Sequence, residues 1–387
     1  MEKITIGLIP SPDLSENLIN KITDKLKVNF EKKIDSNIDW QFEVKVKVFV
    51  GAAEYVNETI NKVIKVKEES NWDYVISITD LPSFSAHKVV MADISTENGV
   101  GLISLPSFGA FPLKRRIIKA LTYIGEILYK NHQKKVEEIT QDMKWNFLFS
   151  NVKRVTPEEA TNTNIRFVLQ NRIIGWLRVL TGMVFANRPW QAIGSFKKVL
   201  TLSFATGTYI SIFSTPWQLS VAYTPSRFIL LMLLSMTGMV VWINIAHNLW
   251  EKKSSKSQSQ YRILYNVTTI MTLVVITVIN YAVLLSLFTL SISLFVPEGI
   301  FDAATDEGAT SQVESYLRLA WLTASLALLV GAVGATIEKE EVIRSATYSY
   351  RQRNRYYEIE KQEESDKQAD EESYSGTQQT HKEQDES

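Results

Sequence analysis

Three titratable side chains, Asp80, His87 and Asp93, lie close together in the sequence and are of the types that hold metal ions or transfer protons. Asp80 directly follows Tyr74–Thr79, whose β-branched residues predict a buried strand. One hypothesis is therefore an enzyme with a site around these three residues. The other is structural, because an aspartate after a strand commonly caps a backbone turn and a single histidine between loops commonly lies at the surface. The pattern favours the structural interpretation, so no catalytic or metal-binding residue is assigned.

A wider group of polar residues is expected where the predicted strands end. In open α/β sheets, ligands bind beyond the carboxyl ends of the strands. The residues predicted to form a ligand-binding pocket are Ser11, Asp13, Asp80, His87, Asp93 and Ser95, with Ser104 and Ser107 at the end of a further strand. Nothing in the pattern identifies the ligand, and the cofactor is unknown.

Several strong signatures of catalysis are absent from the sequence. It has no G-x-G-x-x-G after the first strand, no G-x-x-x-x-G-K-[ST] and no G-x-S-x-G. It also has no cysteine, which excludes disulfides, thiolate metal ligands and cysteine nucleophiles. Basic and acidic residues are equal in number, 42 of each, so the net charge gives no reason to expect nucleic-acid binding.

Hydrophobic periodicity predicts the elements that would position these residues. The predicted order is β-α-β-α-β-β-β-α. The strands are Ile4–Ile9, Trp40–Val50, Tyr74–Thr79, Lys88–Ile94 and Val100–Leu105, and the helices are 13–30, 53–69 and Pro112–Lys130. Asp13 and Glu16 have the spacing of a capping box for the first helix. The order predicts a three-layer α/β domain with a mixed sheet over residues 1–135.

The strand that ends at Thr79-Asp80, with the strand and helix after it, distantly resembles the zincin-like peptidases called archaemetzincins. In that family the helix carries H-E-x-x-H, whose two histidines bind zinc. The predicted helix Pro112–Lys130 contains no histidine. The resemblance therefore implies at most a shared scaffold without the metal, and hydrolysis by that mechanism is not expected.

Four apolar segments in the second half of the chain predict an α-helical membrane domain within residues 199–356. They are Val199–Thr215, Phe228–Trp250, Tyr265–Val296 and Leu317–Thr336. Small residues recur four apart in the first segment (Ser203, Gly207, Ser211, Thr215) and in the last (Ala327, Gly331, Ala335). Such stripes allow helices to approach closely, and they predict that these two helices pack together. The alternative is that the stripes only reflect how common small residues are in membrane helices.

The placement of Lys and Arg predicts the orientation in the membrane. These residues gather before the first segment, between the second and third, and after the fourth, whereas the loop Pro297–Ser315 contains none. Because Lys and Arg are enriched on the cytoplasmic side, both termini are predicted to be cytoplasmic. No Asp, Glu or Lys lies in the middle of a segment, which disfavours a transporter or pore component.

Residues 136–198 are predicted to connect the two domains. Within them, Ile165–Phe185 mixes apolar residues with arginines and predicts an amphipathic helix in the membrane interface. The residues expected there, with the arginines on anionic headgroups, are Arg166, Arg172, Trp176, Arg178, Arg188 and Trp190. The alternative is that this segment packs on the soluble domain. The polar composition of residues 357–387 predicts a disordered tail.

Six short motifs together resemble a functionally uncharacterised bacterial family of multi-pass membrane proteins. They are TDLP (Thr79–Pro82), ADIS (Ala92–Ser95), GVGLISLPSFGAF (Gly99–Phe111), ANRPW (Ala186–Trp190), LRLAW (Leu317–Trp321) and YSYRQR (Tyr348–Arg353). The resemblance implies the same architecture and a bacterial plasma membrane, and it implies no particular activity. Some members carry the label methylenetetrahydrofolate dehydrogenase, but the glycine-rich dinucleotide loop that such an enzyme needs is absent here.

The sequence therefore favours a non-enzymatic membrane protein whose cytoplasmic α/β domain senses a ligand or docks a partner. The expected partners are the lipid bilayer and its anionic headgroups, with a protein partner and a second copy of the chain as further candidates. A membrane-tethered enzyme around Asp80, His87 and Asp93 is the alternative function, and transport is the weakest.

Overall fold

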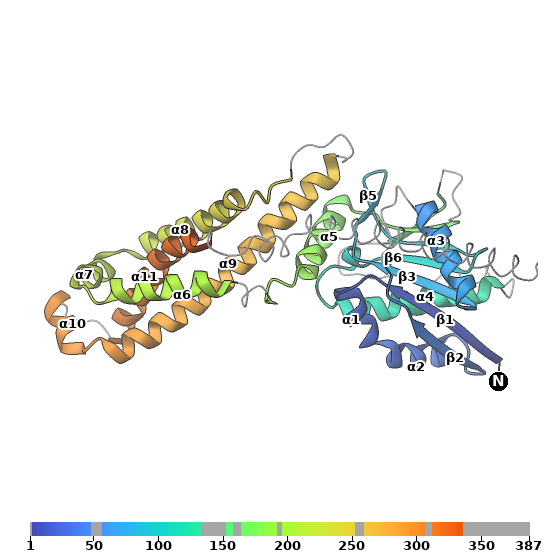
Figure 1. The fold of residues 1–387 in the computed structure, drawn as a ribbon, viewed down its shortest axis with the longest axis horizontal. Coiled ribbons are helices and arrows are strands. Elements are labelled where there is room, and N and C mark those ends of the chain that lie inside the picture. Colours follow the sequence, from blue (N-terminus) through green and yellow to red (C-terminus); the bar gives the residue numbers. More distant parts are fainter. Residues whose placement is uncertain are drawn as a thin grey trace, which may run out of the picture. The chain divides into compact units, whose positions relative to one another are not determined.

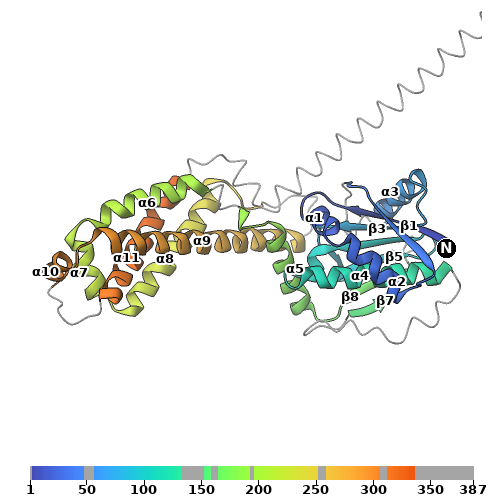
Figure 2. The same ribbon diagram turned by 90° about the horizontal axis from the view of Figure 1, so that it is seen from below.

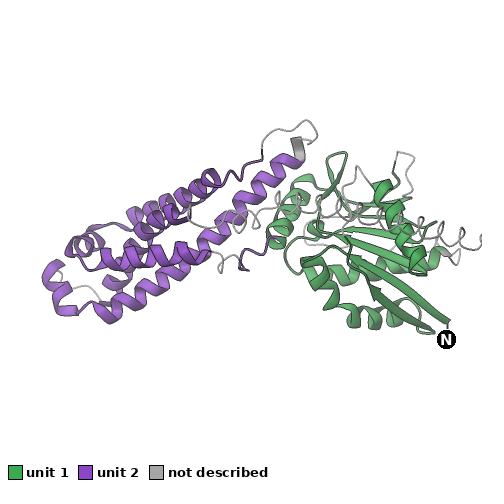
Figure 3. Ribbon diagram, in the orientation of Figure 1, with its two compact units in different colours: residues 1–186, 352–387 green, residues 187–351 purple. Residues whose placement is uncertain are grey.

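The structure is a computed structural model, and it describes residues 2–47, 56–132, 152–157, 164–191, 196–251, 259–305 and 312–335. The chain divides into two compact units, one from residues 1–186 with 352–387 and one from residues 187–351 (Figure 3). The first is an α/β unit and the second is helical. The predicted tail of residues 357–387 lies outside the described residues.

A mixed sheet forms the middle of the α/β unit, as the sequence predicted, but it has eight strands and not the five that were expected (Figure 1). The strand order is β2-β1-β3-β6-β5-β8-β7, and the short β4 pairs with β5. Strands β2, β1, β3 and β6 are parallel, β5 is antiparallel to both β6 and β8, and β7 is antiparallel to β8. The strands are β1 (Glu2–Pro10), β2 (Ile38–Val44), β3 (Tyr74–Thr79), β4 (Ser83–Ser85), β5 (Lys88–Ser95), β6 (Val100–Ser104), β7 (Val152–Val155) and β8 (Ile165–Leu169).

Helices cover both faces of this sheet. They are α1 (Leu14–Asn20), α2 (Thr23–Lys33), α3 (Val56–Glu69), α4 (Leu113–His132) and α5 (Arg172–Ala186), with a short 3-10 helix η2 (Leu105–Phe108). The apolar side of α3 packs on Ile9, Val75 and Val100. Helices α1, α2 and α4 lie on the opposite face (Figures 1 and 2). Phe30 of α2 occupies the place where a side chain on Gly125 of α4 would lie, so these two helices are in close contact.

Two local predictions about the start of the chain are wrong. The predicted first helix is two helices, α1 and α2. The capping box does not form, because Asp13 has a positive φ of 72° and makes no side-chain hydrogen bond to the helix end. The second strand ends at Val44, earlier than predicted, and the rest of its predicted range beyond residue 47 lies outside the described residues.

The prediction of one helix from Ile165 to Phe185 is also wrong for its first residues. Ile165–Leu169 forms strand β8, and all five residues are buried in the sheet. Strands β7 and β8 therefore extend the α/β unit beyond the predicted boundary at residue 135. A strand buried on both faces lacks the alternation that marks a half-exposed strand, so the sequence pattern did not reveal it.

The helical unit contains six helices among the described residues: α6 (Lys197–Ser211), α7 (Ser214–Ala222), α8 (Pro225–Ala246), α9 (Ser259–Phe295), α10 (Glu298–Thr305) and α11 (Gln312–Gly334). Within the described part, three are long and apolar enough to cross a membrane: 225–246, 261–295 and 312–334. The predicted span Val199–Thr215 is divided between α6 and α7. At 1.5 Å per residue, the 15 residues of α6 are about 22 Å long, which is shorter than a hydrocarbon core of about 30 Å.

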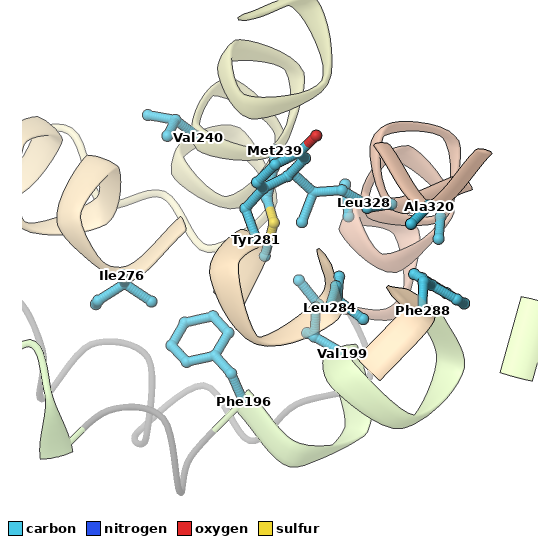
Figure 4. Close-up of a cluster of buried hydrophobic side chains, with 14 of the residues drawn as sticks. Phe196, Val199, Met239, Val240, Ile276, Tyr281, Leu284, Phe288, Ala320 and Leu328 are labelled. Atoms are coloured by element: carbon cyan, nitrogen blue, oxygen red, sulfur yellow. The ribbon is translucent and has the colours of Figure 1, made fainter. Parts of the chain in front are cut away.

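Helices α6 and α11 pack directly on each other, which confirms the prediction from their small residues. A side chain on Gly331 of α11 would collide with Ser203 of α6. A side chain on Gly207 of α6 would collide with Phe288 of α9 and would lie 3.0 Å from Cβ of Ala327. Apolar side chains from α8 and α9 join this contact in one buried cluster, which includes Phe196, Val199, Met239, Leu284, Phe288 and Leu328 (Figure 4).

Replacing Gly207 by Leu should destabilise the helical unit, because the new side chain has no space beside Phe288 and Ala327. Overpacking of this kind typically costs about 1–3 kcal/mol. The matched control is Gly299→Leu in α10, where nothing lies within 4 Å of the added Cβ. We expect the Tm of the full chain in detergent to fall for Gly207→Leu and to stay close to the wild-type value for Gly299→Leu. Equal effects of the two substitutions would contradict the tight α6–α11 contact.

Candidate functional site

A small cavity rich in hydroxyl groups lies where β1, β3 and β6 end. Its polar lining consists of Ser11, Thr59, Ser77, Thr79, Ser83 and Ser104, with the carboxyl group of Asp93. The cavity volume is about 20 Å³, which is room for about one water molecule. Helix α3 contributes Thr59 from the side opposite to α4, and β4 contributes Ser83. The position at the carboxyl ends of parallel strands is the one that the sequence predicted for a pocket.

Two of these hydroxyl groups, those of Ser104 and Thr79, hold the loop after β3 in place. Ser104 Oγ donates a hydrogen bond to the carbonyl oxygen of Leu81 at 2.8 Å, and the Leu81 N–H donates to Thr79 Oγ1 at 3.1 Å. The Ser11 N–H donates to the carbonyl oxygen of Ile78 at 2.9 Å, which continues the pairing of β1 with β3. Ser83 differs from these residues, because its buried hydroxyl has no hydrogen-bond partner among the described residues.

Asp93 forms a buried ion pair with Arg166, which lies opposite it on β8. Arg166 Nε donates to Asp93 Oδ1 at 2.6 Å, and Arg166 Nη1 donates to Ser85 Oγ at 3.0 Å. Only 3% of Asp93 and 9% of Arg166 is exposed. Burial raises the pKa of Asp93, while the positive charge and hydrogen bond of Arg166 act in the opposite direction. The pair joins β5 to β8, so it has an evident structural role.

The structure separates the other residues that were predicted to form a pocket. Asp80 is buried in the loop after β3. His87 lies in the turn between β4 and β5, where its side chain is exposed and its φ is 62°. Asp13 is exposed, and Ser95 lies at the end of β5 that pairs with Val100 at the start of β6. Of the six predicted residues, Ser11 and Asp93 line the cavity.

These positions do not form a metal centre. No group of three or more His, Asp or Glu side chains that could hold a metal ion occurs within the ranges that the structure describes. The imidazole of His87 is at the surface, whereas the carboxyl group of Asp93 is paired with a guanidinium inside the sheet. Asp80, His87 and Asp93, the residues of the enzyme hypothesis, therefore do not share one surface.

The lining residues that sequence reasoning missed come mainly from elements whose place is set by tertiary packing. Thr59 reaches the cavity from α3, and Ser83 reaches it from the short β4. Ser77 carried a usable signal, because it is a serine with an apolar residue on either side within β3. Arg166 was assigned to the membrane interface, and no sequence signal linked it to Asp93.

Two of the arginines predicted at the membrane interface are buried in the α/β unit. Arg166 is held in the sheet, and Arg178 of α5 is 8% exposed. Burial, with a smaller contribution from the positive charge of Arg116, lowers the pKa of Arg178 to about 10. Close packing of α5 on η2 accounts for this burial, since a side chain on Gly182 would collide with the backbone of Pro106. These two residues are therefore not available to headgroups.

The other predicted interface residues remain accessible to different degrees. Arg172 and Trp190 are exposed, while Trp176 and Arg188 are half-buried. Two apolar side chains of α5 lie beside Arg172 and are strongly exposed: Ile173 at 73% and Leu177 at 50%.

A further aromatic contact continues this exposed surface. Phe111, which is 75% exposed, makes an edge-to-face contact with Phe185 of α5 at 5.2 Å between ring centroids. Successive residues 173, 177, 181 and 185 lie on one side of a helix because of its 3.6-residue period. We call the apolar surface formed by Ile173, Leu177, Phe185 and Phe111 the α5 strip. Exposed basic residues adjoin it in sequence at Arg172, Lys114 and Arg115.

Comparisons with known proteins add no family to this description: no family model, no curated protein and no solved structure matches the chain.

Replacing Arg166 by Met should strongly destabilise the α/β unit, because Asp93 would be left buried without its partner. Removing one member of a buried pair typically costs about 3–5 kcal/mol. The matched control is Lys27→Met, which breaks an exposed pair with Asp39 and should cost about 1 kcal/mol or less. The loss of stability in the two variants is compared by hydrogen exchange of peptides from β5 and β8, followed against urea concentration in the full chain.

A double variant separates the charge effect from the loss of packing. Asp93→Leu combined with Arg166→Met removes both charges, and we expect it to recover much of the stability lost in the single variant. An Arg166→Met variant as stable as Lys27→Met would show that the pair does not hold β5 to β8.

Proposed function

We propose that this protein docks its α/β unit on the cytoplasmic surface of a bacterial plasma membrane, with the α5 strip resting on anionic lipid headgroups. The membrane location is supported by three helices that are long and apolar enough to cross a membrane. The observation that carries the docking proposal is the exposure of Phe111, Ile173 and Leu177 on the α/β unit. The cytoplasmic side and the bacterial plasma membrane are supported by the placement of Lys and Arg and by the family resemblance.

The chemistry of the α5 strip suits the boundary between headgroups and acyl chains. Exposed apolar side chains gain free energy when they leave water, and Lys and Arg near an anionic surface add about 1 kcal/mol each. Both kinds of side chain are available, since Arg172, Lys114 and Arg115 are exposed and lie within four residues of Ile173 or Phe111 in the sequence. Helix α5 ends at Ala186, and the helical unit begins at residue 187, so α5 directly precedes that unit in the sequence.

Docking is better supported than recognition of a small molecule inside the α/β unit. The hydroxyl-rich cavity of about 20 Å³ is far smaller than the roughly 300–1,000 Å³ of typical small-molecule sites. A nucleotide or a folate would require the cavity to enlarge. The buried ion pair of Asp93 with Arg166 gives this carboxyl group a structural role. The α/β unit is therefore proposed to act through its surface.

We further propose that α6 is a fourth crossing, which places both termini in the cytoplasm. The start of α6 lies beside the end of α11, since Val199 is 3.3 Å from the position of a Cβ on Gly331. The end of α6 leads into α7, and Trp217 of α7 stacks near Phe301 of α10 at 5.6 Å between centroids. Because α10 connects α9 to α11, helix α6 runs from one end of the bundle to the other. Its shortness is offset by α7 and by the close contact with α11.

The docking proposal is tested with a fluorescent label at Ile173. The sequence has no cysteine, so Ile173→Cys in the full chain can be labelled at one position with an environment-sensitive dye. The matched control is Val28→Cys on α2, another exposed apolar position of the α/β unit. In vesicles that contain phosphatidylglycerol, we expect blue-shifted emission from the Ile173 label and water-like emission from the Val28 label.

The lipid composition of the vesicle separates the two parts of the attraction. Vesicles of phosphatidylcholine alone should give a smaller emission shift at position 173, because their surface has no net negative charge to attract the basic residues. Water-like emission at position 173 in both kinds of vesicle would contradict docking through the α5 strip.

A further inference from the structure

A long apolar groove runs between α8 and α9 on the surface of the helical unit. Its volume is about 610 Å³, and its walls include Leu233, Val241 and Ile245 of α8 with Ile270, Val274 and Val278 of α9. Both helices are among those long and apolar enough to cross a membrane. If the unit is inserted, this groove opens to hydrocarbon.

The occupant of such a groove has to be apolar and thin. Water has few polar partners along these walls, so it is a poor filler. From Leu233 to Ile245 the α8 wall extends about 18 Å at 1.5 Å per residue, which is somewhat more than half of a core about 30 Å thick. An extended acyl chain from a single leaflet has a matching length.

Polar groups gather at one end of the groove. Trp250, which is 54% exposed, and Asn244 belong to its lining. The backbone N–H of Glu251 donates to Asn266 Oδ1 at 2.8 Å, which joins this end of α8 to α9. Arg262 lies one helical turn before Asn266 on α9. An indole and an amide at this end of the groove, with a guanidinium one helical turn before Asn266, are groups that suit the glycerol and phosphate region of a lipid.

We propose that the α8–α9 groove binds one acyl chain of an anionic phospholipid, whose headgroup lies at Asn244, Trp250 and Arg262. The occupant follows from three observations: the walls belong to helices long and apolar enough to cross a membrane, the α8 wall has the length of a leaflet chain, and Arg262 lies one helical turn from Asn266, which bonds the residue after Trp250. This inference rests on the membrane location in the proposed function. It does not depend on the α5 strip.

The test uses the full chain reconstituted with phosphatidylglycerol, extracted into mild detergent and examined by native mass spectrometry. We expect about one phosphatidylglycerol per chain to remain bound. Val278→Trp should fill the groove from α9 and lower the affinity about tenfold. The matched control is Leu290→Trp, which changes another exposed residue of the same helix outside the groove and should leave retention unchanged.

Each other outcome overturns the inference in a defined way. Retention that Val278→Trp does not change means that the lipid binds elsewhere. If phosphatidylcholine is retained as well as phosphatidylglycerol, the anionic headgroup does not contribute to binding. Loss of a dimer in Val278→Trp, with no loss of lipid, makes a second copy of the chain the occupant. If the chain is not in the membrane fraction at all, the proposed function fails, whereas an inserted chain that retains no lipid refutes only the groove proposal.

Discussion

The close approach of α6 to α11 is the contact on which the helical unit depends. Lipid chains are as apolar as the helix surfaces, so helices in a membrane associate chiefly through van der Waals contacts and hydrogen bonds. Gly207 and Gly331 allow these contacts, because side chains at these positions would displace Phe288 and Ser203. The short α6 is thereby held along a helix that is long enough to span the bilayer. At the end of α11, a ring nitrogen of His247 forms a hydrogen bond with the carbonyl oxygen of Ala335 at 3.0 Å, which joins α8 to α11.

The α/β unit depends on a different kind of interaction. Its sheet is extended by β8 and β7, and the buried pair of Arg166 with Asp93 fixes β8 to β5. An ionised aspartate inside a sheet is costly without a partner, so each member of the pair requires the other. The chain after β8 leads directly into α5, whose inner side packs on η2 and whose outer side forms the α5 strip. One ion pair thus helps to place the surface that we propose to dock on lipid.

Periodicity predicted the elements whose burial can be read from neighbouring residues. Strands β1, β3, β5 and β6 and helix α4 fall close to their predicted positions, because each has a continuous apolar run or an apolar face. Strand β8 was not predicted, because its buried residues do not alternate and because the charge of Arg166 was interpreted as part of an interfacial helix. The Asp93 that neutralises it lies 73 residues away. The cavity was predicted in part. Ser11 follows β1 and Ser104 ends β6, whereas Thr59 and Ser83 belong to elements that only the tertiary fold brings to the cavity.

The division of the first predicted membrane segment into α6 and α7 also has a local cause. Phe213 has an extended backbone, and the Trp217 indole N–H donates to the carbonyl oxygen of Ser211 at 2.8 Å. This bond satisfies a carbonyl at the end of α6 and allows the chain to turn. The absence of charge from Val199 to Thr215 gave no sign of the turn, because composition indicates burial and not backbone direction.

Whether α6 crosses the membrane determines whether the two termini lie on one side or on opposite sides. The most direct measurement is labelling of single cysteines in intact spheroplasts with a membrane-impermeant maleimide, since the chain has no cysteine of its own. Four crossings predict that Lys21→Cys and Ser387→Cys are both protected until the cells are lysed, while Gly299→Cys in α10 is labelled. Labelling of Ser387→Cys in intact spheroplasts, with Lys21→Cys still protected, would mean three crossings and would contradict the proposed architecture.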